Sequence, residues 1–252
     1  MPIDNLNREQ IESYQKFAKE KLGFSFNNIH LLITALTHRS YVNEHRRSGA
    51  EHNERLEFLG DAILEMVVSD YLYRNFNQPE GVMTALRAAL VRTEANCASG
   101  EKLGYAPLVR LSRGQRLGTE RAYAGILADC FEAVIGAIYL DQGYDRASSF
   151  IYKHVISKMP EILEEETWRD PKSYFQELCQ HFQGIIPSYR TVEVAGPDHA
   201  RIYTIALYTG EEEVARATAQ SKQEAQTLAA RDAIRKYKKR GWALPIVQVK
   251  HV

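Results

Sequence analysis

Acidic side chains recur at helical spacing in residues 53–62. Glu54, Glu57 and Asp61 stand at positions i, i+3 and i+7, so on a helix they fall within a sector of about 60°. Three carboxylates on one face repel each other unless a cation lies among them. Apolar side chains occupy roughly the opposite side: Leu56, Leu59, Ile63 and Val67. The segment predicts a helix with one face in a core and a second face that is either a solvated acidic surface or a cation site.

A second acidic pair lies in an otherwise apolar segment, residues 126–137. Asp129 and Glu132 stand at i, i+3 there, and no Lys or Arg occurs within residues 122–145. Acids in such surroundings are rarely buried without a partner. Gly136, seven residues after Asp129, would let a neighbouring helix approach closely. Two helices facing each other would then form an all-oxygen cage from four carboxylates: Glu57, Asp61, Asp129 and Glu132.

The residue types in this cage restrict the metal it could hold. Di-iron helix bundles use Glu-x-x-His motifs, and none of the eight histidines has a Glu three residues before it. Calcium loops place their oxygens along a Gly-containing loop rather than on helices. Hard oxygen ligands on facing helices favour Mg²⁺ or Mn²⁺, and two such ions about 4 Å apart suit phosphodiester hydrolysis. The chemistry indicates a phosphoesterase, with small phosphoesters as well as nucleic acids open as substrates.

The bulk composition is that of a globular protein. The chain has 252 residues, 44% apolar and 25% charged, with 32 basic and 32 acidic residues, so any electrostatic footprint for nucleic acid must be local. Three widely spaced cysteines without a CxxC pattern argue against a disulfide framework or a thiolate zinc site and fit a reducing cytosol. The polar N-terminus is no signal peptide. Apolar runs are too short to predict a membrane span.

The first part of the chain reads as helical throughout, which predicts an all-α domain over residues 1–158. Asn7 and Asn28 are expected N-caps, and Gly23 is an expected helix end. Residues 43–53 and 104–118 read as irregular. The expected helices are residues 7–22, 29–36, 54–73, 82–99, 123–140 and 144–158. An acidic linker is expected over residues 159–170, because residues 161–170 carry charge with little periodicity.

A different pattern follows the expected linker. Residues 172–183 are helical in pattern, and residues 188–194, 201–208 and 212–219 are rich in β-branched and aromatic residues. Ser221 is an expected N-cap for a last helix that ends in a basic run. The order α-β-β-β-α predicts a compact α+β module over residues 171–240, and the tail, residues 241–252, is expected to be disordered.

Several of these motifs together resemble the ribonuclease III family. Residues 53–62 resemble its signature, and residues 126–140 look like its second acidic motif. The runs Asp-Pro-Lys-Ser at 170–173, Gly-Pro-Asp-His at 196–199 and Ser-Lys at 221–222 resemble its C-terminal double-stranded RNA-binding domain. The similarity covers residues 7–240. It implies an all-α endonuclease domain followed by a small α+β (α-β-β-β-α) double-stranded RNA-binding domain.

The resemblance also implies roles for single residues. Glu57, Asp61, Asp129 and Glu132 match the family's catalytic metal ligands, for Mg²⁺ with Mn²⁺ as a substitute. Glu54 and Glu80 match further acids near the cleavage centre, and Val82 departs from a position that is often acidic. Phe58 matches a residue at the family's dimer interface. A cytoplasmic homodimer that cuts double-stranded RNA, leaving 5′-phosphates, 3′-hydroxyls and a short 3′ overhang, is therefore expected, with ribosomal and other RNA precursors as substrates.

The expected RNA contacts follow from how proteins recognise double-stranded RNA, which is through its shape, its 2′-hydroxyls and its phosphates. Gln176 and His199 match minor-groove contacts of the family. Ser221 and Lys222 match its phosphate contacts at a helix N-terminus, a position already suited to anions. Gln223 stands where a second lysine is common, and Ala217 and Ala219 replace usual glycines, so weaker phosphate binding is expected. The alternative to the enzyme is a non-catalytic double-stranded RNA-binding protein with the same fold.

Overall fold

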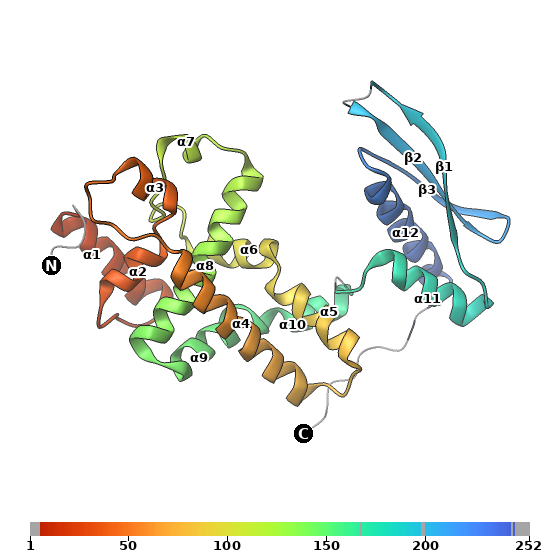
Figure 1. Cartoon of the computed structure of the whole chain (residues 1–252). Helices are drawn as coiled ribbons and strands as arrows, with labels where there is room; N and C mark the ends of the chain where they lie inside the picture. Colours follow the sequence, from red (N-terminus) through yellow and green to blue (C-terminus); the bar gives the residue numbers. More distant parts are fainter. Residues whose placement is uncertain (1–5, 167, 198–199, 243, 245–252) are drawn as a thin grey trace. The chain divides into compact units, whose positions relative to one another are not determined.

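The computed structural model describes residues 6–166, 168–197, 200–242 and 244. The chain divides between Glu165 and Glu166 into two compact units, which are described separately (Figure 1). The first unit is helical: α1 (Arg8–Phe17), a π-helical turn (Ala18–Leu22), α2 (Ile29–Ala35), α3 (Arg39–Glu44), α4 (Glu54–Asn75), α5 (Glu80–Val91), α6 (Thr93–Leu103), α7 (Arg113–Arg116), α8 (Glu120–Gln142), α9 (Tyr144–His154), a 3₁₀ turn (Ile156–Lys158) and α10 (Met159–Glu165). The second contains α11 (Pro171–Gln183), β1 (Ser188–Ala195), β2 (Ile202–Thr209), β3 (Glu212–Ala219) and α12 (Lys222–Lys239).

Helix α8 forms the centre of the first unit and packs against α2, α4, α6 and α9. Phe131, Val134 and Ile138 on it are fully buried, so its apolar residues supply the core that the sequence predicts. By length and composition α8 is the one helix in the described part of the chain that could cross a membrane. Because 61% of its apolar window is buried inside the protein, it is the core helix of this unit.

Local sequence determines where several helices begin and end. Asn7 forms a capping box with Gln10, in which each residue's side chain accepts a hydrogen bond from the other's backbone N–H. The Asn28 side chain accepts from His30 N and caps α2. Gly23 ends the first helical stretch with φ 90°, a left-handed conformation that favours glycine. These two caps and this end confirm the predictions made from the sequence.

The second unit is a three-stranded antiparallel sheet in the order β1-β2-β3, with α12 packed against β2, β3 and α11. Leu207 on β2 pairs with Tyr189 on β1 and with Ala215 on β3. The strands lie beside the two helices in Figure 1. Fully buried side chains from both layers form the core, among them Phe175, Leu178, Leu207, Ala229 and Ala233.

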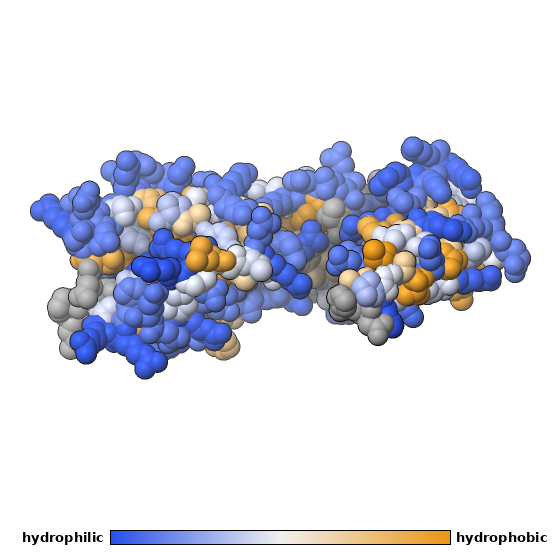
Figure 2. All heavy atoms as spheres, turned by 90° about the horizontal axis from the view of Figure 1, so that it is seen from above, coloured by the Kyte–Doolittle hydropathy of each residue, from blue (hydrophilic) through white to orange (hydrophobic). Residues whose placement is uncertain are grey.

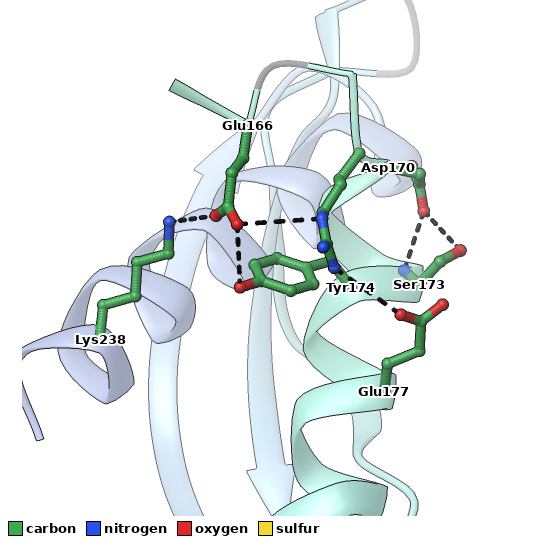
Figure 3. Close-up of polar contacts among 7 residues, drawn as sticks. Glu166, Asp170, Ser173, Tyr174, Glu177 and Lys238 are labelled. Atoms are coloured by element: carbon green, nitrogen blue, oxygen red, sulfur yellow. Dashed lines mark hydrogen bonds and ion pairs between the residues drawn. The ribbon is translucent and has the colours of Figure 1, made fainter. Parts of the chain in front are cut away.

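A polar network attaches the start of the second unit to its two helices (Figure 3). The Glu166 carboxylate pairs with Lys238 on α12 and accepts a hydrogen bond from the Tyr174 hydroxyl on α11 at 3.4 Å. The Arg169 guanidinium lies 4.4 Å from the centre of the Tyr174 ring. Asp170 caps α11 by accepting from Ser173 N at 2.9 Å. The segment that precedes α11 is therefore part of this unit.

The structure differs from the sequence predictions in four segments. The helix predicted over residues 82–99 is two helices, α5 and α6, because Arg92 is extended with ψ 154°. The short helix α7 lies where irregular chain was predicted, and α10 occupies the first part of the predicted linker. The tail prediction is wrong for Trp242, whose ring stacks on Phe182 with 4.7 Å between ring centres.

Candidate active site

Two glycines allow α4 and α8 to cross in backbone contact. A Cβ atom on Gly60 would lie 1.8 Å from the carbonyl oxygen of Glu132, and one on Gly136 would lie 2.3 Å from that of Leu56. Such distances are far below any real Cβ contact, so only glycine fits at either position. The sequence indicated Gly136 through its spacing from Asp129, and the structure confirms the close approach. Gly60 is its counterpart on α4, and sequence reasoning missed it.

The crossing places four carboxylates beside each other. Glu57 and Asp61 flank Gly60 on α4, while Asp129 and Glu132 precede Gly136 on α8. Glu57, Asp129 and Glu132 are half-buried, and Asp61 is exposed. The acidic cluster, as we name these four residues, is thus drawn from two segments far apart in the sequence, as the sequence predicted.

Burial and mutual repulsion make negative charge costly in the acidic cluster. Burial raises the pKa of Glu57, and the charges of Asp129, Glu54 and Asp61 raise it further. Burial, with the charge of Asp61 and other acids, raises the pKa of Glu132 to about 7. Burial also raises the pKa of Asp129, and Arg39 partly opposes that shift. A group of carboxylates in this state has a strong electrostatic demand for a cation.

Asn96 on α6 contacts the cluster from the side. Its Nδ2 donates a hydrogen bond to Glu132 Oε1 at 2.8 Å, and its side chain is fully buried. No motif in the sequence pointed to this residue, because an isolated Asn within a helical segment carries no signal of its own.

The two auxiliary acids are placed differently. Glu54, in the first turn of α4, pairs with Arg39 at 3.4 Å and with His52 at 3.7 Å, and its charge acts on Glu57 and Asp129. Glu80, in the first turn of α5, accepts a hydrogen bond from the Thr84 hydroxyl at 3.0 Å. Its charge is not among those that shift the pKa values of the cluster. The structure therefore brings Glu54 to the cluster and leaves Glu80 apart from it.

The ligand atoms that the acidic cluster offers are of the type that a hard divalent cation binds. They are carboxylate oxygens, which Mg²⁺ and Mn²⁺ prefer, and their charges are not balanced by a buried Lys or Arg in the described chain. Arg110, the one buried Arg among the residues that the structure describes, stacks on Tyr41 instead. As the side chains stand, no three or more His, Cys, Asp or Glu residues of the described ranges converge closely enough to hold an ion. The cluster fits such an ion through its oxygens and charge, and closing around it requires side-chain rotation.

An exposed aromatic residue and a cavity adjoin the acidic helix α4. Phe58 is 81% exposed, although its neighbours Leu56 and Glu57 turn inward. A cavity of about 690 Å³ lies beside the same turn and is lined by Leu31, Leu56, Leu59, Leu140 and polar residues. The face in Figure 2 is mostly hydrophilic, with several hydrophobic patches among the polar residues.

In the second unit, the expected RNA contacts lie on exposed helical positions. Gln176 is exposed on α11, and Lys222 is exposed at the start of α12. The Ser221 hydroxyl accepts from Glu224 N at 3.1 Å, which confirms the predicted N-cap. His199 lies outside the described residues. The basic run at the end of α12 is partly used internally, since Lys236 donates to Val214 O at 2.7 Å and Lys238 pairs with Glu166.

Comparisons with known proteins agree with both units. Residues 28–159 match the family described as Ribonuclease-III-like, and residues 171–237 match the double-stranded RNA binding motif. Ribonuclease 3 of Oceanobacillus iheyensis is 42% identical over 217 residues, which are 86% of this chain and 95% of that protein. Ribonuclease 3 of Protochlamydia amoebophila is 40% identical over 215 residues, 85% of this chain and 88% of that protein. The nuclease domain of the Campylobacter jejuni ribonuclease III is 34% identical, with a TM-score of 0.49, over 59% of this chain and 98% of that chain.

A helical unit with a carboxylate cluster, followed by a double-stranded RNA-binding module, defines a nuclease that acts on RNA duplexes. The chain belongs to the ribonuclease III family. It is a double-stranded RNA-specific endoribonuclease, a hydrolase, with a mostly helical nuclease domain and a C-terminal α+β RNA-binding domain.

Proposed function

We propose that Glu57, Asp61, Asp129 and Glu132 hold Mg²⁺, for which Mn²⁺ can substitute, and that the enzyme hydrolyses RNA duplexes with this ion. The observation that carries the proposal is the raised pKa of three cluster carboxylates beside a fourth acid at the α4–α8 crossing. The chemistry such an ion supplies is activation of water and stabilisation of charge on a phosphodiester.

The residues of this chain position the reaction. The backbone contact at Gly60 fixes the separation of the two helices that carry the acid pairs, so that only side-chain rotation is needed to bring the carboxylates around an ion. Glu54, held by Arg39, adds negative charge beside Glu57. Glu80 is a further auxiliary acid, in the first turn of α5. Hydrolysis leaves a 5′-phosphate and a 3′-hydroxyl.

The active enzyme is a homodimer in this proposal, in which each subunit cuts one strand and the products carry a short 3′ overhang. The exposed Phe58 supports it, because one large apolar side chain beside a cavity that Leu31, Leu56, Leu59 and Leu140 help to line suits insertion into a partner subunit. Phe58→Ala is expected to shift the protein towards monomer in sedimentation velocity. Met66→Ala, an exposed apolar residue on the same helix, is expected to leave the dimer intact.

The RNA-binding domain contributes contacts to sugar and phosphate in this proposal. Gln176 and His199 contact the minor groove, and Lys222 with the Ser221-capped start of α12 contacts a phosphate. The exposure of Gln176 and Lys222 supports these roles. We place the enzyme in the cytoplasm, acting on ribosomal and other RNA precursors, including messenger RNA.

The deciding experiment separates cleavage from binding. Glu132→Ala is expected to abolish cleavage of a long RNA duplex in Mg²⁺ and to leave gel-shift affinity nearly unchanged. Glu120→Ala, the same change in the first turn of the same helix, is the matched control and should retain activity. If wild type fails to cut with either Mg²⁺ or Mn²⁺ while still binding duplex RNA, the molecule is a non-catalytic RNA-binding protein instead.

A further inference from the structure

Asn96 occupies a buried position between three helices. Its Nδ2 donates to Glu132 Oε1 on α8 at 2.8 Å and to the carbonyl oxygen of Val91, the last residue of α5, at 3.0 Å. The residue itself lies on α6 and is fully buried. One amide group therefore ties the end of α5 and the start of α6 to a carboxylate of the acidic cluster.

The two hydrogen bonds determine which way the amide points. Both partners of Nδ2 are acceptor oxygens, so the reversed amide would turn its own carbonyl oxygen against them. In the observed orientation Oδ1 is buried and has no hydrogen-bond partner in the part of the chain that the structure describes. A buried acceptor without a partner is unfavourable, and a residue that retains one calls for an explanation beyond packing.

The neutral character of the amide supplies that explanation. A Lys or Arg at this position would satisfy Glu132 by neutralising its charge, and would then compete with a divalent cation for the carboxylate. Asn96 instead fixes one carboxylate oxygen and leaves the negative charge in place. Glu132 Oε2 accepts no hydrogen bond from the residues that the structure describes, so it stays available to a ligand. Partners of this kind orient the side chains that bind metal ions.

We propose that Asn96 is a positioning residue for Glu132, which holds the carboxylate oriented for a divalent cation and couples that orientation to the α5–α6 junction. This inference rests on the proposed function, because it takes Glu132 as a metal ligand. A purely structural role, in which Asn96 only satisfies the Val91 carbonyl, is the competing explanation.

The test uses the full-length protein and three variants. Asn96→Leu removes both donated hydrogen bonds and keeps the branching and the number of side-chain heavy atoms. Ser99→Ala is the matched control, because Ser99 is a buried polar residue of the same helix whose hydroxyl donates to Ala95 O at 2.8 Å without contacting the cluster. Glu132→Gln reports the loss of the ligand itself. Mn²⁺ affinity is measured by titration followed by electron paramagnetic resonance, and the cleavage rate is measured as a function of Mg²⁺ concentration.

For Asn96→Leu the Mn²⁺ dissociation constant and the Mg²⁺ concentration at half-maximal rate are each expected to rise about 10–100-fold. The KM for duplex RNA is expected to stay at the wild-type value. Ser99→Ala should lower the melting temperature without either metal effect. A folded Asn96→Leu protein with wild-type Mn²⁺ affinity and wild-type Mg²⁺ dependence overturns the proposal.

A second measurement on wild type keeps the proposal testable if Asn96→Leu does not fold. The side-chain amide resonance of Asn96 is expected to shift when Mg²⁺ is added, and an unmoved resonance at saturating Mg²⁺ overturns the proposal. Failure of this proposal can be distinguished from failure of the proposed function. If wild type cuts RNA with Mg²⁺ and Glu132→Gln does not, the proposed function is supported, whatever the result at Asn96.

Discussion

The closest backbone contact between α4 and α8 offers a direct test of how the acidic cluster is positioned. In Gly60→Ala the new Cβ would lie 1.8 Å from the carbonyl oxygen of Glu132. Ordinary van der Waals contact begins at 3.4 Å, so increasing 1.8 Å to 3.4 Å requires a displacement of about 1.6 Å. The obstructing atom is backbone, so no side-chain rotation can provide that space. The helices must move apart at the point that separates Glu57 from Asp61.

The size of the effect follows from this displacement. Overpacking of this kind costs typically about 1–3 kcal/mol of stability, which corresponds to roughly 2–12 °C in melting temperature for a unit of this size. A misplacement of about 1 Å at reacting groups costs on the order of 100-fold in rate. We therefore expect Gly60→Ala to lower the cleavage rate at least about 100-fold at a temperature where the variant is folded.

The assay is single-turnover cleavage of a long RNA duplex in Mg²⁺, with melting followed by circular dichroism and binding followed by gel shift. Gly125→Ala on α8, the other helix of the crossing, is the control. A Cβ there meets nothing within 4 Å, so this change should be neutral or slightly stabilising. Duplex affinity should be similar in both variants. If Gly60→Ala melts and cleaves like wild type, the glycine crossing does not position the acids and the reasoning fails.

Three further predictions concern other parts of the molecule. Burial and three nearby lysines lower the pKa of His154 to about 4, so the stability that its neutral ring contributes is present above pH 6.5 and lost as pH falls towards 4. Urea denaturation at pH 7 and pH 4.5 should therefore show a loss of roughly 1–3 kcal/mol that His154→Phe lacks. Trp242→Ala should destabilise the RNA-binding domain by about 1–3 kcal/mol in calorimetry, because the ring contacts both Phe182 and Tyr237; an unchanged transition would contradict the packing. Gln223→Lys should steepen the fall of log affinity with log salt by about 1, and identical slopes would rule out a phosphate near that position.

Much of the fold followed from local sequence, and the exceptions have physical causes. The caps at Asn7, Asn28 and Ser221 act through their own side chains, so residue type alone predicted them. The break between α5 and α6 falls at Arg92 without any Gly or Pro. The Asn96 side chain donates a hydrogen bond to Val91 O across this break, a contact that no hydrophobic periodicity reveals. Trp242 was missed because one aromatic residue in a polar tail signals nothing until its partners are known.

The acidic cluster was predictable because burying carboxylates in apolar segments is unfavourable unless a cation or another partner compensates their charge. Spacing placed Asp129 and Glu132 on the face that also carries Gly136, and the structure shows that face against α4. Spacing could not identify Arg39, which pairs with Glu54 from another helix. Nor could it identify Asn96, because contacts between distant segments are set by the packing of whole helices.

The main-chain contact at Gly60 and Gly136 separates the architecture of this domain from its chemistry. The two helices approach to backbone contact there, while the carboxylates beside that contact repel one another. Exchanging one of these acids for its amide therefore reduces the charge repulsion. The inactive variant is expected to have a higher melting temperature than the active protein. Cleavage activity can therefore be lost without loss of the fold, and a protein that has lost its catalytic carboxylates is expected to keep its binding to RNA duplexes.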